Sequence, residues 1–186
     1  MKTGSGRAMG FTLLELMVTV SLMAFMGLLA ATSFDTGSWL AHQRLKGAAR
    51  ELSTNLQKAR MNAIKQNTRW AITFNAANNT YTLVSAGPDN DIDTAADNVT
   101  DVTASLPASG SGVVFGFGRA NKDINGAALP GGPVTFTGNR VVFTPRGLAT
   151  APGTCYLTND HQDPMAVVVR LNGSVDIRRW DGSKFE

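Results

Sequence analysis

The chain changes from polar to apolar residues at position 10. Residues 1–10 are small, polar or basic, whereas residues 11–34 read FTLLELMVTVSLMAFMGLLAATSF and contain one charge, Glu15. A helix of this length reaches roughly 36 Å at about 1.5 Å per residue, which exceeds the hydrocarbon thickness of a bilayer, about 30 Å. The pattern predicts a leader over residues 1–10 and a transmembrane helix over residues 11–35.

A second helical pattern follows, in which apolar residues recur at spacings of three and four. It predicts an amphipathic continuation of the helix over residues 36–68, with its apolar stripe on a sheet. Gly37 leaves open whether the helix breaks there, because Gly costs only about 1 kcal/mol in a helix. The stripe consists of Leu45, Ala48, Ala49, Leu52, Leu56, Ala59, Ala63 and Ile64.

The opposite face of this second helix is basic. We expect it to face solvent, with anionic lipid headgroups or an acidic partner surface as the alternatives. Its members are Arg44, Lys46, Lys58, Arg60 and Lys65.

From residue 69 onward, short runs rich in β-branched and aromatic residues are separated by Gly, Asn and Pro. RWAITFN and TYTLVSA predict a hairpin over residues 69–86. Further strands are expected at residues 113–118, 134–137, 140–144, 155–158, 166–171 and 174–179. The chain is thus predicted to be α+β, with a long N-terminal helix packed on an antiparallel β-rich head, residues 69–186, in two small sheets.

Charge and cysteine content narrow the choices further. The isoelectric point near 9.3 suggests nucleic acid, but the formal charge is only +3, and Lys2 and Arg7 in the leader supply two of the positive charges. Basic residues before the apolar run favour keeping that end in the cytoplasm and the head outside. Cys155 is the single cysteine, so no intramolecular disulfide forms.

Glu15 is the residue whose position most needs an explanation. A carboxylate in a lipid-facing helix costs up to roughly 2.5 to 3.5 kcal/mol at the helix centre, and less near an end. One explanation is that the positive end of the helix dipole offsets the charge. The other is that cleavage after Gly10 creates an α-amino cation at Phe11, one helical turn away. If that amine belongs to a neighbouring subunit, the pair fixes the register between packed helices.

The stretch Gly10-Phe11-Thr12-Leu13-Leu14-Glu15 resembles the type IV prepilin motif. The resemblance implies that a membrane-embedded prepilin peptidase cuts between Gly10 and Phe11 and N-methylates Phe11. It also implies that Glu15 directs assembly into a filament. The expected partners are other pilin or pseudopilin subunits, the peptidase, an inner-membrane assembly platform and the lipid bilayer.

The C-terminal stretch from residue 141 to 180, beginning VVFTPRGLAT, is similar to the head of the GspH/FimT group of minor pilins and pseudopilins. That similarity implies a minor structural subunit of a type II secretion pseudopilus or a type IV pilus. The chain would reside in the inner membrane with its head in the periplasm, and then in a periplasmic or surface filament. The sequence leaves the choice between the two systems open.

An acidic loop offers a candidate metal site. Asp89, Asp91, Asp93 and Asp97 resemble the start of a Ca²⁺ loop. However, Thr94 and Thr100 stand where an EF-hand needs Gly and Glu. The expectation is therefore no cofactor, with an irregular Ca²⁺ site as the alternative to a solvated acidic loop.

Basic residues near the C-terminus offer a candidate nucleic-acid site. Arg170, Arg178 and Arg179 flank the Asn172-Gly173 turn, and some FimT-like minor pilins bind DNA through such a motif during uptake. Asp176 and Asp181 dilute the charge, and arginines on an edge strand also block edge-to-edge pairing. DNA uptake is kept as the alternative function, and nucleic acid is not an expected partner.

The material for catalysis is sparse. His42 falls on the helix and His161 near Cys155, with no Ser-His-Asp order and no metal-ligand spacing. The sequence therefore predicts a chain that is not an enzyme.

Overall fold

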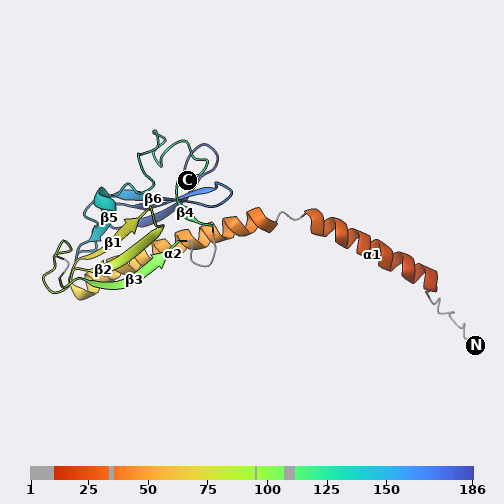
Figure 1. The fold of residues 1–186 in the computed structure, drawn as a ribbon, viewed down its shortest axis with the longest axis horizontal. Coiled ribbons are helices and arrows are strands. Elements are labelled where there is room, and N and C mark those ends of the chain that lie inside the picture. Colours follow the sequence, from red (N-terminus) through yellow and green to blue (C-terminus); the bar gives the residue numbers. More distant parts are fainter. Residues whose placement is uncertain (1–10, 34–35, 95, 107–111) are drawn as a thin grey trace, which may run out of the picture. The chain divides into compact units, whose positions relative to one another are not determined.

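The structure is a computed structural model that describes residues 11–33, 36–94, 96–106 and 112–186. The chain divides into two compact units, Met1–Gly37 and Ser38–Glu186, which are described separately. The helices are α1 (Leu13–Ser33) and α2 (Thr36–Gln66). The strands are β1 (Trp70–Asn75), β2 (Thr80–Ser85), β3 (Val99–Ser105), β4 (Val114–Phe115), β5 (Arg140–Phe143), β6 (Gly153–Thr158), β7 (Pro164–Val169) and β8 (Val175–Arg179) (Figure 1).

The strands form two four-stranded antiparallel sheets. Their orders are β3-β2-β1-β5 and β4-β6-β7-β8. In the first sheet Ile72 lies opposite both Leu83 and Val141, and in the second Val167 lies between Cys155 and Ile177. The predicted α+β class with a helix on two small sheets is confirmed.

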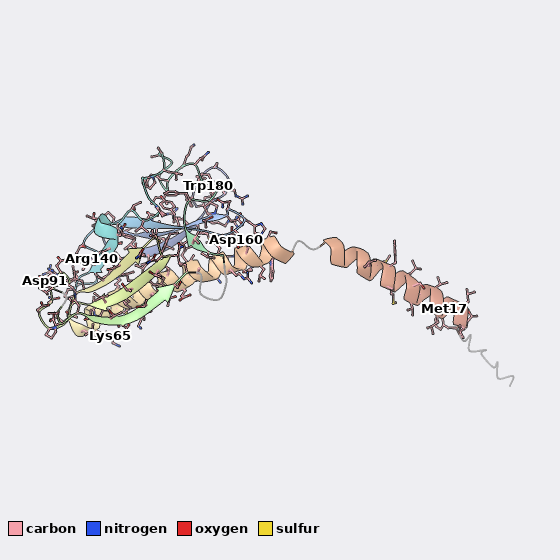
Figure 2. The ribbon with its side chains drawn as sticks, viewed as in Figure 1. Met17, Lys65, Asp91, Arg140, Asp160 and Trp180 are labelled. Carbon is pink, nitrogen blue, oxygen red and sulfur yellow. The ribbon has the colours of Figure 1, made fainter. Side chains whose placement is uncertain are left out.

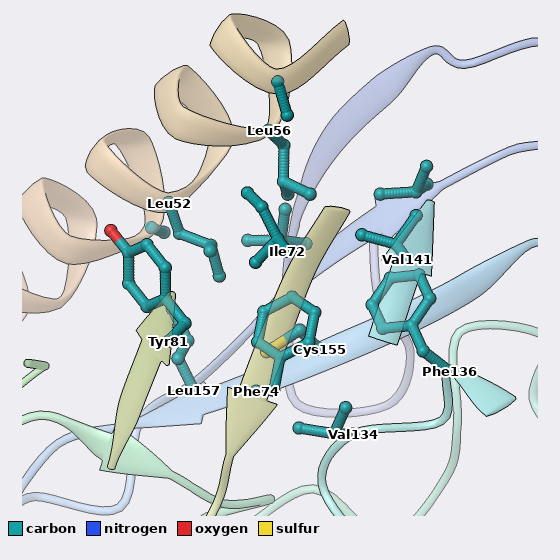
Figure 3. Close-up of a cluster of buried hydrophobic side chains, with 14 of the residues drawn as sticks. Leu52, Leu56, Ile72, Phe74, Tyr81, Val134, Phe136, Val141, Cys155 and Leu157 are labelled. Atoms are coloured by element: carbon teal, nitrogen blue, oxygen red, sulfur yellow. The ribbon is translucent and has the colours of Figure 1, made fainter. Parts of the chain in front are cut away.

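One apolar core joins α2 to the inner faces of both sheets. Leu45, Leu52 and Leu56 of α2 have no exposed surface, because the stripe at three-and-four spacing turns onto the sheets. Figure 3 shows α2 side chains facing residues of both sheets, among them Tyr81 and Cys155. Ile64, expected in the stripe, is instead 46% exposed, whereas its neighbour Ala63 is fully buried in this core.

Two smaller clusters cover the outer faces of the sheets. Tyr156 and Ala166, on the outer face of the second sheet, pack with Trp180 and Phe185. Ala71 and Val142, on the outer face of the first sheet, pack with Ala86 and with Ile92 of the loop between β2 and β3. β6 and β7 are therefore largely buried on both faces, which explains their continuous apolar sequences.

The structure corrects two expectations about strands. Residues 134–137 do not form a strand: Val134 makes a single bridge to Cys155, and a 3-10 turn at Thr137–Asn139 follows, with Gly138 at a φ of 65°. Conversely, β3 was not predicted. Its sequence is mostly polar because it is an edge strand with one neighbour, β2.

Candidate functional site

The N-terminal helix begins immediately after the junction that the motif marks. Gly10 lies outside the described residues, whereas Phe11 and Thr12 directly precede α1. The Thr12 hydroxyl accepts a hydrogen bond from the Glu15 amide at 3.2 Å, and the Thr12 carbonyl accepts one from the Leu16 amide at 3.2 Å. Thr12 is therefore the N-cap of α1, and Glu15 is the third helical residue.

This cap fixes the electrostatic position of Glu15. The Thr-x-x-Glu spacing is that of a capping box, a signal that the sequence analysis overlooked. Glu15 lies in the first turn, where the helix dipole stabilises a carboxylate by about 0.3 to 1 kcal/mol. The cost of a carboxylate in lipid is up to roughly 2.5 to 3.5 kcal/mol at a helix centre and smaller at an end position such as this one. The dipole therefore offsets at least part of that cost.

The surface of α1 is apolar on every side. Exposure of its large apolar side chains from Phe11 to Leu28 ranges from 49% for Val18 to 81% for Phe11, and Met17 can be followed in Figure 2. The Thr19 and Ser21 hydroxyls donate to backbone carbonyls of the same helix at 2.9 and 2.8 Å. Within the described residues, no helix is both long and apolar enough to cross a membrane.

Two basic side chains of α2, Lys58 and Arg60, form polar contacts with other parts of the head. Lys58 Nζ lies 2.7 Å from the Asp101 carboxylate of β3. Arg60 Nε donates to the Gly147 carbonyl at 2.9 Å, and its Nη2 donates to the Asn172 carbonyl at 3.3 Å. Arg60 thus holds two turns against α2, and the expectation that its guanidinium simply faces solvent is wrong.

The carboxylates of the acidic loop mostly bind their own loop. The Asp89 and Asp91 carboxylates accept hydrogen bonds from the amides two residues later, at 2.9 and 3.1 Å. The Thr94 hydroxyl also donates to Asp89, and this bond is the main reason that the pKa of Asp89 is lowered. The Asp97 carboxylate accepts from the Asp89 amide at 3.3 Å.

Asp93, the remaining carboxylate of this loop, forms an ion pair with Arg140 of β5 at 2.6 Å. Asp91 and Arg140 are labelled at the same end of the head in Figure 2. Across the described part of the chain, no group of three or more His, Cys, Asp or Glu side chains could hold a metal ion. The Ca²⁺ alternative stays a sequence prediction.

The three C-terminal arginines do not form one patch. Arg170 Nη2 lies 3.0 Å from the Asp176 carboxylate. Along β8 side chains alternate between faces, so Arg179 shares the face of Ile177, which packs against the core, and Arg178 shares the opposite face with Asp176.

A pocket at the N-terminal end of the Ser38–Glu186 unit gathers charges that are distant in sequence. Asp163 forms an ion pair with Arg119 and lies 3.8 Å from His42 Nδ1. Trp39 and Trp180 also line this pocket. Sequence reasoning missed Asp163, and no local signal marks it.

The lone thiol does not offer an activated nucleophile. Cys155 is fully buried, and burial raises the pKa of its thiol well above the ordinary value. Its thiolate is therefore disfavoured.

A comparison with protein-family models matches residues 48–174 to the family described as type II transport protein GspH. This match spans more than half of the chain and covers α2 from about its fourth turn onward, together with strands β1 to β7, and it ends just before β8. A search of curated proteins found no match.

Solved structures resemble the fold. The minor pseudopilin EpsH from the type 2 secretion system of Vibrio cholerae is 12% identical, with a TM-score of 0.50 over 73% of this chain and 97% of that one. The type IV minor pilin FimU of Pseudomonas aeruginosa is 14% identical, with a TM-score of 0.51 over 78% of this chain and 94% of that one. At these identities the likeness establishes the fold.

Proposed function

The chain belongs to the GspH family of type II transport proteins, and from this premise we propose that its N-terminal motif is processed and then drives filament assembly. As a family member it is a structural subunit, a minor pseudopilin or pilin of a type II secretion pseudopilus or a type IV pilus. It assembles with other pilin-like subunits. The proposal concerns how residues 1–35 bring this about.

The first step is cleavage between Gly10 and Phe11 by a prepilin peptidase, followed by N-methylation of the Phe11 amine. The support is the motif itself, with Thr12 capping the helix directly after the junction. Methylation keeps the positive charge on the amine. The mature chain then begins with a cation one helical turn before Glu15.

The second step is pairing of Glu15 with the Phe11 amine of a neighbouring subunit. The observation that carries this step is that Glu15 is the only charge on α1, a helix whose apolar side chains are exposed on all sides. In an apolar environment an unpaired carboxylate is costly, whereas a carboxylate paired with an ammonium at a packed interface is not. Pairing therefore favours one axial register between helices.

We propose that residues 11–35 are held in the inner membrane before assembly, with the head in the periplasm. Lys2 and Arg7 precede the apolar run and favour this orientation. The prepilin peptidase and an inner-membrane assembly platform are the proposed partners at this stage. The chain is proposed to have no catalytic role of its own, since Cys155 is buried and Asp163 is engaged by Arg119.

The test is the intact mass and N-terminal sequence of the full chain extracted from membranes, after expression with an active prepilin peptidase and with an inactive one. Active peptidase should yield a chain that starts at Phe11 and is heavier by one methyl group. The inactive enzyme should yield a chain starting at Met1.

The matched variant is Gly10→Val, which places a β-branched side chain at the cleaved bond and should leave the precursor intact. A wild-type chain that still starts at Met1 beside active peptidase would refute processing. In that case the motif would be a coincidence, and Glu15 would be an ordinary helix-end charge.

A further inference from the structure

The second sheet ends at β8, and part of the outer edge of β8 has no strand partner among the described residues. Arg179 exchanges two backbone hydrogen bonds with Glu186, at 2.8 and 2.9 Å, on the side away from β7. The Trp180 amide, in contrast, donates toward β7, to the Pro164 carbonyl. Because backbone groups alternate sides along an antiparallel strand, those of Val175 and Ile177 point to the outer edge, like those of Arg179.

Phe185 and Glu186 already occupy the first positions of a fifth strand beside this edge. Phe185 forms a bridge with Trp180, and Glu186 pairs with Arg179. Beside Ile177 and Val175, no hydrogen bond from any described residue reaches the outward backbone groups. Within the part of the chain that the structure describes, these two residues therefore have no strand partner on their outer side.

Two pockets lie between β8 and α2, and together they are called the β8 edge groove. At one end α2 contributes Lys46 and Arg50, opposite Met165, Ile177, Arg179 and Glu186. Further along, α2 contributes Gln57, Arg60, Met61 and Ile64, opposite Gly173, Ser174 and Val175. Side chains of α2 therefore lie opposite β8 at both pockets.

The groove carries uncompensated positive charge. Three cations line or flank it, Lys46, Arg50 and Arg179, and among the described residues no carboxylate lies within 4.0 Å of their charged nitrogens. The Glu186 carboxylate forms an ion pair with Lys184 instead, at 2.9 Å. Such a groove attracts a segment that carries carboxylates.

The groove also offers apolar surface at its far end. Met61 is 57% exposed and Ile64 46% exposed, and Val175 and Ile177 are partly buried. An added strand presents side chains alternately to the two faces of the sheet. Because Ile177 and Arg179 share one face, every second side chain of an added strand would point to that face, and acidic side chains there would meet the cations.

We propose that the β8 edge groove is an interaction surface that receives an extended, acidic segment of a neighbouring pilin-like subunit as an added strand. The proposal rests on the chain's role as a filament subunit. It assigns the outward backbone groups of Val175 and Ile177 to main-chain hydrogen bonds with the partner, and Lys46, Arg50 and Arg179 to its carboxylates.

The test uses the full chain in detergent and two labelled peptides of about ten residues, one alternating Glu with Val and the other alternating Lys with Val. Binding is followed by fluorescence anisotropy, and the β8 amides by hydrogen exchange. Arg50→Glu alters the groove, and Arg44→Glu is the matched control, because Arg44 is an exposed arginine of α2 outside the groove. Ile177→Pro removes an outward N–H without removing a bond to β7, and Ile177→Val keeps that N–H.

We expect that only the Glu peptide binds, and that it slows hydrogen exchange of the Ile177 amide. Arg50→Glu should weaken its binding roughly tenfold, whereas Arg44→Glu should change it by less than about twofold. Ile177→Pro should abolish binding while β7 amides keep their protection, and Ile177→Val should retain binding.

Equal binding of the two peptides, or binding without protection of Ile177, would overturn the proposal. A duplex DNA that protects β8 when the Glu peptide does not would also overturn it and assign the edge to nucleic acid. Processing at Phe11 is read separately by mass, so failure of the proposed function and failure of this inference are distinguishable.

Discussion

The two helices of this chain differ in what covers their apolar side chains. In α2, Leu52 and Leu56 have no exposed surface, because both sheets of the head pack against the same stripe. In α1, Leu14 is 73% exposed and Leu22 53% exposed. The same residue type is thus buried by the sheets of the head in α2 and largely exposed in α1.

The charged side chains of the two helices also differ in where their interaction partners lie. Lys58 and Arg60 of α2 reach an acidic side chain and two carbonyls of the head. In α1, the Glu15 amide donates to the Thr12 hydroxyl, and the Glu15 carboxylate lies at the positive end of the helix dipole. The comparison teaches that α2 contributes to folding of the head, whereas the apolar side chains of α1 stay exposed, as the proposed assembly role of α1 requires.

The largest effect is expected from Glu15→Ala. Because this change removes the proposed partner of the Phe11 amine, incorporation into filaments should fall roughly tenfold or more, while processing at Phe11 continues. Incorporation is measured by immunoblot of sheared or cross-linked filaments, and processing by intact mass. Glu51→Ala, at an exposed position of α2, is the control and should assemble normally. Normal incorporation of the Glu15 variant would refute the pairing role.

Matched Leu→Ala substitutions in the two helices test the comparison directly. Leu52→Ala empties a fully buried position and should lower the free energy of unfolding by about 2 to 5 kcal/mol. Leu22→Ala should change it by less than about 0.5 kcal/mol, because that side chain is already 53% exposed. Urea unfolding of the full chain in detergent, followed by circular dichroism, measures both. Equal losses would mean that α1 also stabilises the head.

Much of the fold could be predicted because its signals are local. The stripe containing Leu45, Leu52 and Leu56 predicted the buried face of α2, and a change to period-two apolar patterning predicted the β1–β2 hairpin. The motif from Gly10 to Glu15 is also local. Its placement at the start of α1 follows from the Thr12 cap, which could have been predicted from Thr-x-x-Glu.

The features that were not predicted from the sequence depend on contacts with residues far along the chain. β3 is a polar edge strand whose hydrogen bonds come from β2, so its own sequence hardly marks it. Arg60 was expected on a solvated face, but its two acceptors, Gly147 and Asn172, lie far along the chain. The groove beside β8 likewise follows from strand order, which composition and periodicity do not specify.

A smaller effect is expected at Tyr81, which lies beneath α2. Its hydroxyl accepts a hydrogen bond from Asn55 Nδ2 at 2.8 Å, and burial raises its pKa to about 12. Tyr81→Phe should cost about 1 kcal/mol near neutral pH, since it leaves the Asn55 donor without this acceptor.

The pH dependence sharpens this prediction. Because the folded pKa of Tyr81 exceeds the unfolded value of about 10, the stabilisation is complete below pH 10 and is lost as pH rises toward 12. The wild type should lose about 2 to 3 kcal/mol from this group over that range, and Tyr81→Phe should show a shallower slope. Some slope remains in the variant, since burial also raises the pKa of Tyr156. An unchanged slope would contradict the assignment to Tyr81.

The smallest effect is expected at the ion pair between Lys58 and Asp101, whose atoms are 2.7 Å apart and whose side chains are 45% and 34% exposed. Water and salt screen such a pair, so Lys58→Ala should cost only about 0.2 to 1 kcal/mol, and less in about 1 M salt. Arg44→Ala on the same helix, with no ion pair among the described residues, is the control in urea unfolding. A salt-independent loss at Lys58 would show that charges on α2 are not screened by water. The contrast with Glu15 would then no longer rest on the apolar surroundings of α1.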